Sequence, residues 1–152
     1  SVAMLAKIAA AIEPHRPAQR VRDALKDAAD PEDRVTLPDL IAWSVEAALE
    51  RVTPALVVVP THSGTTARSI SRYRLPVWIL GVSSQEATCQ RLQFTYGVHP
   101  EHEPDHPDDW RIYTRKWLQD HGLEGDLVIL TEGPSSKHPE ANNRMEIIDL
   151  RR

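Results

Sequence analysis

The distribution of apolar residues predicts five short β-strands in this chain. The clearest is the run 55–59, which is apolar at every position and rich in β-branched residues. A run without a polar face is typical of a strand buried on both sides, as in a parallel sheet. We expect strands over 55–59, 75–83, 96–100, 125–131 and 144–150.

Most of the first fifty residues, and the segments between the strands, have helical spacing instead. Apolar residues recur there every three or four positions, as on one face of a helix. In the first helix this face carries Leu5, Ile8, Ala9 and Ile12. We expect helices over 2–12, 18–29, 37–51, 67–73, 85–95 and 108–121. In the helix 85–95, Ser84 is the expected cap and Phe94 is expected to turn partly inward.

The alternation of strands and helices predicts a single α/β domain with a mostly parallel sheet and helices on both faces. Residues 1–52 form its helical lead-in and 53–152 its α/β core. The segment between the last two strands has no helical pattern, so that pair is expected to be antiparallel. In such sheets, ligands bind beyond the carboxyl ends of the strands.

The turn after the first strand is the strongest candidate for a binding site. It contains four hydroxyl groups, one imidazole and one glycine, contributed by Thr61, His62, Ser63, Gly64, Thr65 and Thr66. Free backbone N–H groups at a helix start, together with hydroxyl donors, suit a phosphate or another anion. The alternative interpretation is that Ser63 or Thr65 simply caps the next helix. The glycine and lysine spacing of a nucleotide-binding P-loop is absent.

The charge and composition of the chain argue against some classes of binding partner. The 152 residues carry a net charge of −4, with a pI near 6.0, which argues against nucleic acid as the main partner. No apolar run has the length of a membrane span, so no membrane partner is expected. No signal peptide is predicted, and the single cysteine, Cys89, fits a reducing cytoplasm.

Three other groups of residues have possible roles. His99, His102 and His106 lie among acidic residues and form a candidate metal site, whereas the alternative is a solvated acidic loop. A serine hydrolase built on His62 and Ser63 lacks the nucleophile-elbow pattern. The four tryptophans are expected to anchor the core or an interface, and they are Trp43, Trp78, Trp110 and Trp117.

Several specific motifs follow one another along nearly the whole chain. The most specific part is Thr61-His-Ser-Gly-Thr-Thr-Ala67, followed by Ser71-Arg-Tyr-Arg74. Further motifs are the entry helix from Val2, Trp43-Ser-Val-Glu-Ala-Ala48, Ile79-Leu-Gly-Val82, Tyr96-Gly-Val98, Gly125-Asp-Leu-Val-Ile-Leu-Thr131 and Asn143-Arg-Met-Glu-Ile147. In this collinear order, the motifs resemble the C-terminal α/β domain of pyruvate kinase.

This resemblance implies a three-layer α/β/α fold with five strands, the last antiparallel. It implies a regulatory and assembly domain in which the turn 61–66 holds the phosphate of a sugar-phosphate effector. A later loop, 133–143, would close over the sugar and includes Ser135, Ser136, Lys137 and His138. No catalytic residue and no cofactor is expected in this chain. Magnesium and potassium would be bound only by a separate catalytic barrel.

Two departures from the family bear on the effector. The turn 61–66 contains no lysine or arginine, and the segment 101–109 is acidic. A bisphosphate would be repelled unless Arg68, Lys137 or Arg144 compensates. This favours a monophosphate, another anion or no effector over fructose bisphosphate.

Three functional hypotheses remain open at this stage. In the first, the chain is a non-catalytic regulatory domain. In the second, it is a stand-alone binding module or an enzyme of unknown reaction that uses the same cleft with His62, Lys137 and His138. The third is mainly structural, because the last strand, 144–150, has apolar residues and no proline and can pair with its copy in a homo-oligomer. A start at Ser1 fits a domain cut at its boundary, and Met4 fits a native start equally well.

Overall fold

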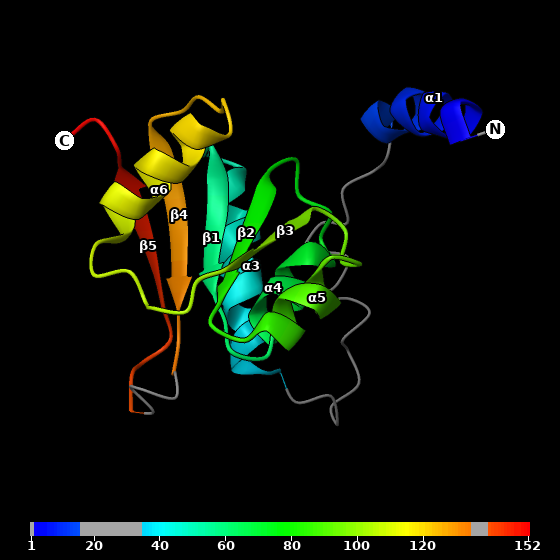
Figure 1. Ribbon diagram of the computed structural model, residues 1–152. Coiled ribbons are helices and arrows are strands. Elements are labelled where there is room, and N and C mark those ends of the chain that lie inside the picture. Colours follow the sequence, from blue (N-terminus) through cyan, green and yellow to red (C-terminus); the bar gives the residue numbers. More distant parts are fainter. Residues whose placement is uncertain (1, 16–34, 135–139) are drawn as a thin grey trace.

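The computed structural model describes residues 2–15, 35–134 and 140–152, and its strands form one five-stranded sheet (Figure 1). The strand order is β3-β2-β1-β4-β5, with β5 antiparallel to β4 and all other pairs parallel. The strands are β1 (Leu56–Pro60), β2 (Trp78–Ser83), β3 (Val98–His102), β4 (Leu127–Glu132) and β5 (Arg144–Asp149). The predicted α/β class and the antiparallel last strand are confirmed.

Helices cover both faces of the sheet, which gives the three predicted layers (Figure 1). One face is covered by α3 (Leu37–Leu49), α4 (Thr65–Ser71) and α5 (Glu86–Leu92), and the other by α6 (Trp110–Asp120). Strand β1 lies in the middle of the sheet and is buried on both sides. Val57 and Val59 belong to the apolar cluster under α3–α5, and Leu56 and Val58 to the cluster under α6.

An N-capping residue stabilises the start of helix α6, and two tryptophans pack the helix against the sheet. The Asp109 carboxylate accepts hydrogen bonds from the backbone N–H groups of Arg111 and Ile112, which satisfies two donors that have no partner within the helix. Trp110 and Trp117 are seven residues apart and therefore lie on the same face. Both indoles are buried against the sheet. They act as core anchors, as predicted, whereas Trp78 is 54% exposed.

Two expectations around α5 are wrong. The residue before the helix is Gln85 rather than Ser84, and its side chain makes no capping hydrogen bond. Phe94 is 93% exposed, because the helix ends at Leu92 and Phe94 lies outside its apolar face.

Strand β3 begins and ends two residues later than predicted, so Glu101 and His102 belong to the strand and not to the acidic loop. Because successive side chains of a strand point to opposite faces of the sheet, Glu101 and His102 lie on opposite faces.

The N-terminal helix, α1 (Val2–Ile12), is formed as predicted and is followed by a 3₁₀ turn, η1 (Glu13–His15). None of its side chains is buried, including the apolar stripe of Leu5, Ile8 and Ile12. The expected helix 18–29 lies outside the described residues. In the described part of the chain, every helix is too short or too polar to cross a bilayer.

Candidate functional site

Hydrogen bonds within the turn after β1, and from the turn to its neighbours, fix its conformation. The N–H of Thr61 donates to the carbonyl of Val82 at 2.8 Å, and the Thr61 hydroxyl accepts from the N–H of Gly64 at 2.8 Å. Thr88 of α5 donates its hydroxyl to the carbonyl of His62 at 2.8 Å. The turn is therefore tied to both β2 and α5.

Gly64 is required at the start of α4. Its φ of +80° lies in the left-handed region, which side chains disfavour. A Cβ there would lie 3.0 Å from Leu92 Cδ2 and 2.9 Å from an Arg68 guanidinium nitrogen. Gly64 is also the residue at the cap position of α4, and it makes no side-chain capping hydrogen bond itself. Ser63 and Thr65 share a hydrogen bond at 2.9 Å, and the Ser63 hydroxyl also accepts from the backbone N–H of Thr65, the first residue of α4, at 3.4 Å. The capping interpretation is therefore met in part by Ser63, although neither residue occupies the cap position.

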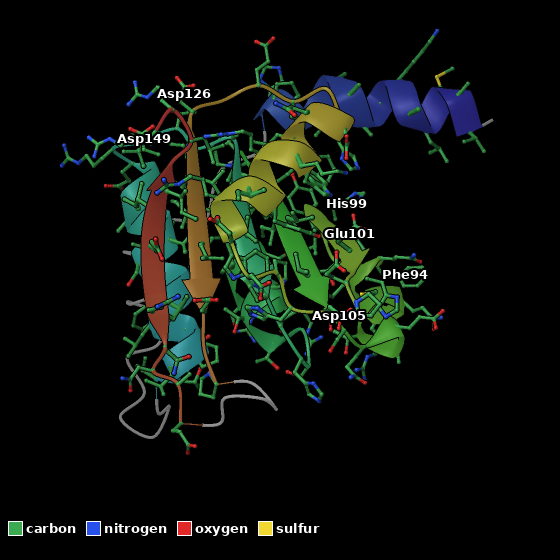
Figure 2. All side chains as sticks on the ribbon, turned by 60° about the vertical axis from the view of Figure 1, so that its left-hand side comes forward. Phe94, His99, Glu101, Asp105, Asp126 and Asp149 are labelled. Carbon is green, nitrogen blue, oxygen red and sulfur yellow. The ribbon has the colours of Figure 1, made fainter. Side chains whose placement is uncertain are left out.

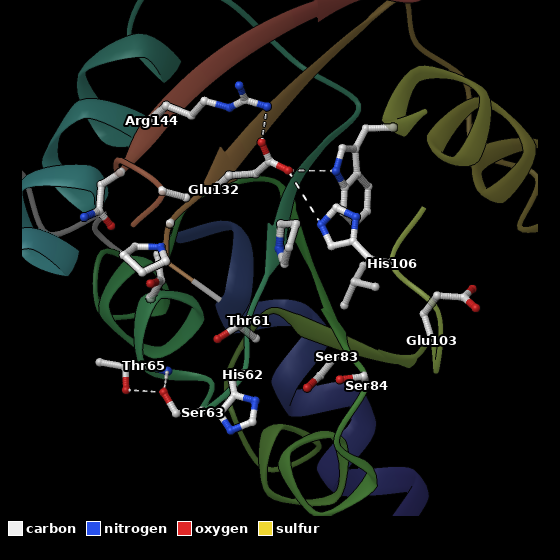
Figure 3. A pocket seen from close by; sticks show the side chains of 18 of the residues that line it. Thr61, His62, Ser63, Thr65, Ser83, Ser84, Glu103, His106, Glu132 and Arg144 are labelled. Atoms are coloured by element: carbon white, nitrogen blue, oxygen red, sulfur yellow. Dashed lines mark hydrogen bonds and ion pairs between the residues drawn. The ribbon is translucent and has the colours of Figure 1, made fainter. Parts of the chain in front are cut away.

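A cleft opens beside this turn, at the carboxyl ends of β1, β2 and β4 (Figure 3). Its cavity volume is about 820 Å³, which is large enough for a small metabolite. The polar residues of its wall are Thr61, His62, Ser63, Thr65, Thr66, Ser83, Ser84, Glu103, His106, Glu132, Asn142, Asn143 and Arg144. Five of the six predicted binding residues thus line one cavity, and Gly64 shapes the turn behind them.

Several donors at the cleft have no partner among the described residues. These are the backbone N–H groups of His62, Ser63 and Thr66 and the hydroxyl of Thr66. The helix dipole adds little here, because α4 has only seven residues. The capacity of the turn to hold an anion therefore depends on these individual donors.

One glutamate organises the opposite wall of the cleft (Figure 3). The Glu132 carboxylate accepts a hydrogen bond from the indole N–H of Trp110 at 2.9 Å and forms an ion pair with Arg144. The His106 imidazole lies 3.8 Å from the same carboxylate. Arg144 is the one arginine in the described wall, and Glu103 adds a second carboxylate. The described wall therefore carries one arginine, already paired with Glu132, and two carboxylates.

Arg68, one of the predicted compensating cations, faces the turn from behind. Its guanidinium donates to the carbonyl of Ser63 at 3.2 Å and to the hydroxyl of Thr65 at 3.4 Å. It supports the shape of the turn and is absent from the wall of the cleft. The closing-loop residues Ser135, Ser136, Lys137 and His138 lie outside the described residues.

The three histidines considered as a candidate metal site are separated. His102 contacts the carbonyl of Ser84 at 3.3 Å, and His106 contacts the carbonyl of Pro107 at 2.9 Å in the cleft. His99 is grouped instead with Glu101 and His121. His99 and His102 are three positions apart on β3, so their side chains point to opposite faces of the sheet.

The chain resembles known proteins along most of its length. A family model described as the α/β domain of pyruvate kinase matches residues 39–148. The pyruvate kinase of Thermococcus litoralis is 34% identical, and the match covers 99% of this chain and 32% of that protein. The pyruvate kinase of Geobacillus stearothermophilus is 31% identical, with 76% of this chain and 20% of that protein covered.

Solved structures show the same fold. The pyruvate kinase of Cryptosporidium parvum in complex with ADP superimposes with a TM-score of 0.69 over 84% of this chain and 26% of that chain, at 21% identity. The strand order and the helical layers define a three-layer α/β/α domain with a cleft at the carboxyl ends of its strands. The chain belongs to the pyruvate kinase α/β domain family. It spans about a third or less of the length of these relatives.

Proposed function

We propose that this chain is the non-catalytic regulatory domain of a pyruvate kinase, and that its cleft binds the phosphate of a small allosteric effector. Family membership supports the first part of this proposal. The second is supported by one observation, the hydroxyl-lined turn 61–66 at the mouth of an 820 Å³ cavity. In the proposal, phosphoryl transfer and the magnesium and potassium ions belong to a separate catalytic part, in the cytoplasm.

The charges in the cleft specify the class of effector. Glu132 is neutralised by Arg144, and Glu103 has no arginine or lysine partner among the described residues. A second phosphate would meet this carboxylate without a matching cation, which costs free energy. A sugar monophosphate, or inorganic phosphate alone, fits this balance better than fructose bisphosphate.

Thr66 offers the sharpest test of the cleft. Its hydroxyl lines the cavity and makes no hydrogen bond within the described structure, so Thr66→Val should fold normally. Removing one hydrogen-bond donor should weaken phosphate binding about three- to tenfold. Calorimetric titration with inorganic phosphate and a hexose monophosphate measures this loss. Thr53→Val, at an exposed threonine outside the cleft, is the matched control and should bind like the parent.

Arg144→Gln tests the charge balance in the same titration. Without the guanidinium, Glu132 is no longer neutralised, so phosphate affinity should fall by about tenfold or more. Parent protein that binds neither phosphate nor the hexose monophosphate at millimolar concentration would contradict the proposed site. Equal affinity in the parent and Thr66→Val would place the bound phosphate elsewhere.

We also propose that the domain assembles into a homo-oligomer through β5. This strand lies at the edge of the sheet with β4 as its one neighbour, and Ile147 on it is 49% exposed. An edge strand with exposed apolar residues offers unpaired backbone groups to a second copy. Ile147→Lys should convert the assembly to monomers in light scattering, whereas Ile112→Lys, at an exposed isoleucine of α6, should not. A parent that stays monomeric at high concentration would refute the proposal.

A further inference from the structure

A second polar cluster lies away from the cleft, between β3 and the end of α6. His99 and Glu101 alternate along β3 and therefore point to the same face, toward α6; Figure 2 shows them side by side. His121 is the first residue after α6. Each of the three residues offers a metal-ligating atom, and these atoms lie within 4.8 Å of one another. His121 thus meets Glu101 and His99, which lie 20 and 22 positions before it in the sequence, at the edge of the sheet.

The indole of Trp117 orients all three side chains. It stacks on the His121 ring with centroids 3.9 Å apart, and it meets the His99 ring edge-on at 5.3 Å. Its N–H donates to Glu101 Oε2 at 3.0 Å. Such outer contacts fix the orientation of side chains that bind a metal ion.

The hydrogen bond of His121 determines which of its ring nitrogens is free. His121 Nδ1 lies 2.8 Å from the carbonyl oxygen of Trp117. A carbonyl only accepts, so in neutral His121 the proton is on Nδ1 and the lone pair is on Nε2. A backbone carbonyl bound to one ring nitrogen is the usual arrangement around a metal-ligating histidine.

The cluster also has an unbalanced negative charge. Among the described residues, the Glu101 carboxylate lies 3.8 Å from the His99 imidazole and has no lysine or arginine partner. Burial raises the pKa of Tyr113, and the carboxylates of Glu101 and Glu103 raise it further. Such a site attracts a cation.

We propose that His99, Glu101 and His121 bind one divalent transition-metal ion, with zinc as the best match. Two imidazoles and one carboxylate are zinc ligands, whereas magnesium and calcium prefer oxygen ligands alone. His121 is exposed, so water completes the coordination.

The three ligand atoms must move closer together to hold a zinc ion. Tetrahedral zinc with bonds of about 2.0–2.1 Å holds its ligand atoms about 3.3 Å apart. The 3.8 Å between His99 Nε2 and Glu101 Oε2 must therefore shorten by about 0.5 Å. The most distant pair, which lies within 4.8 Å, must shorten by at most about 1.5 Å, and side-chain rotation supplies both movements. The bound ion would fasten the end of α6 to the edge strand β3, so its role is structural.

Zinc titration of the untagged, metal-free 152-residue chain tests the proposal. One equivalent should bind with micromolar affinity or tighter, and a hundredfold excess over Kd should raise the Tm by roughly 5–10 °C. Cobalt bound at the same site should give the visible absorption of a tetrahedral ion. His121→Ala and Glu101→Gln should each weaken zinc binding at least about tenfold and remove the rise in Tm.

The matched control is His102→Ala, which removes a histidine from the same strand on the opposite face. It should bind zinc like the parent. Circular dichroism of each metal-free variant checks that it is folded. The proposal is overturned if the parent binds no zinc at millimolar concentration. It is also overturned if His121→Ala binds as tightly as the parent, because the ion then lies on other histidines.

Discussion

The two tryptophans of α6 build two clusters with nearly the same geometry. The cleft cluster consists of Trp110, Glu132 and His106, and the edge cluster of Trp117, Glu101 and His99. The indole-to-carboxylate hydrogen bonds are 2.9 and 3.0 Å, and both histidines lie 3.8 Å from their carboxylate. The paired rings meet edge-on at 5.1 and 5.3 Å.

The clusters differ in what balances the carboxylate. Glu132 in the cleft cluster is neutralised by Arg144, and the neighbouring turn 61–66 supplies hydrogen-bond donors. Glu101 in the edge cluster has no such arginine among the described residues, and His121 adds a second imidazole instead. We infer from this comparison that the residue added to the shared arrangement decides which charge of ligand each cluster favours. We propose an anion for the first and a metal cation for the second.

The largest expected effect comes from removing the shared anchors. Trp110→Ala and Trp117→Ala should each lower the free energy of unfolding by about 3–5 kcal/mol, since each removes a buried indole. Urea denaturation followed by circular dichroism measures both losses. A loss below about 1 kcal/mol for either variant would show that the two clusters are not equivalent anchors.

A smaller and unequal effect is expected for the two carboxylates. Glu132→Gln should lower the free energy of unfolding by about 1–2 kcal/mol, because the largely buried carboxylate loses its ion pair with Arg144. Glu101→Gln should change it by less than about 0.5 kcal/mol without metal, because no arginine or lysine pair is broken. The same urea experiment measures both variants, and equal losses would remove the distinction between the clusters.

The sequence predicted those features that depend on local pattern. The apolar run of β1 has no polar face, so its central, doubly buried position in a parallel sheet followed directly. The position of the turn 61–66 at the carboxyl end of β1 followed from the same pattern. Phe94 was misplaced because helical spacing continues past Leu92 in the sequence, although the helix itself stops there.

The edge cluster could not be predicted in the same way. Closeness in sequence suggested His99, His102 and His106 as a group, but strand alternation and the loop after β3 separate them. His121 reaches His99 only because Trp117 packs α6 against the sheet. That contact depends on the tertiary fold. A signal was nevertheless present, since His121 is four residues after Trp117 and lies on the same side of a helix.

The most direct test is one ¹⁵N-labelled chain titrated in turn with inorganic phosphate and with zinc, followed by amide chemical shifts. Phosphate should move the amides of residues 62–66 and leave His99, Glu101 and His121 unchanged. Zinc should move the amides of those three residues and leave 62–66 unchanged. Shifts of the same residues by both ligands, or phosphate-induced shifts centred outside the cleft, would contradict the assignment of opposite charges to the two clusters.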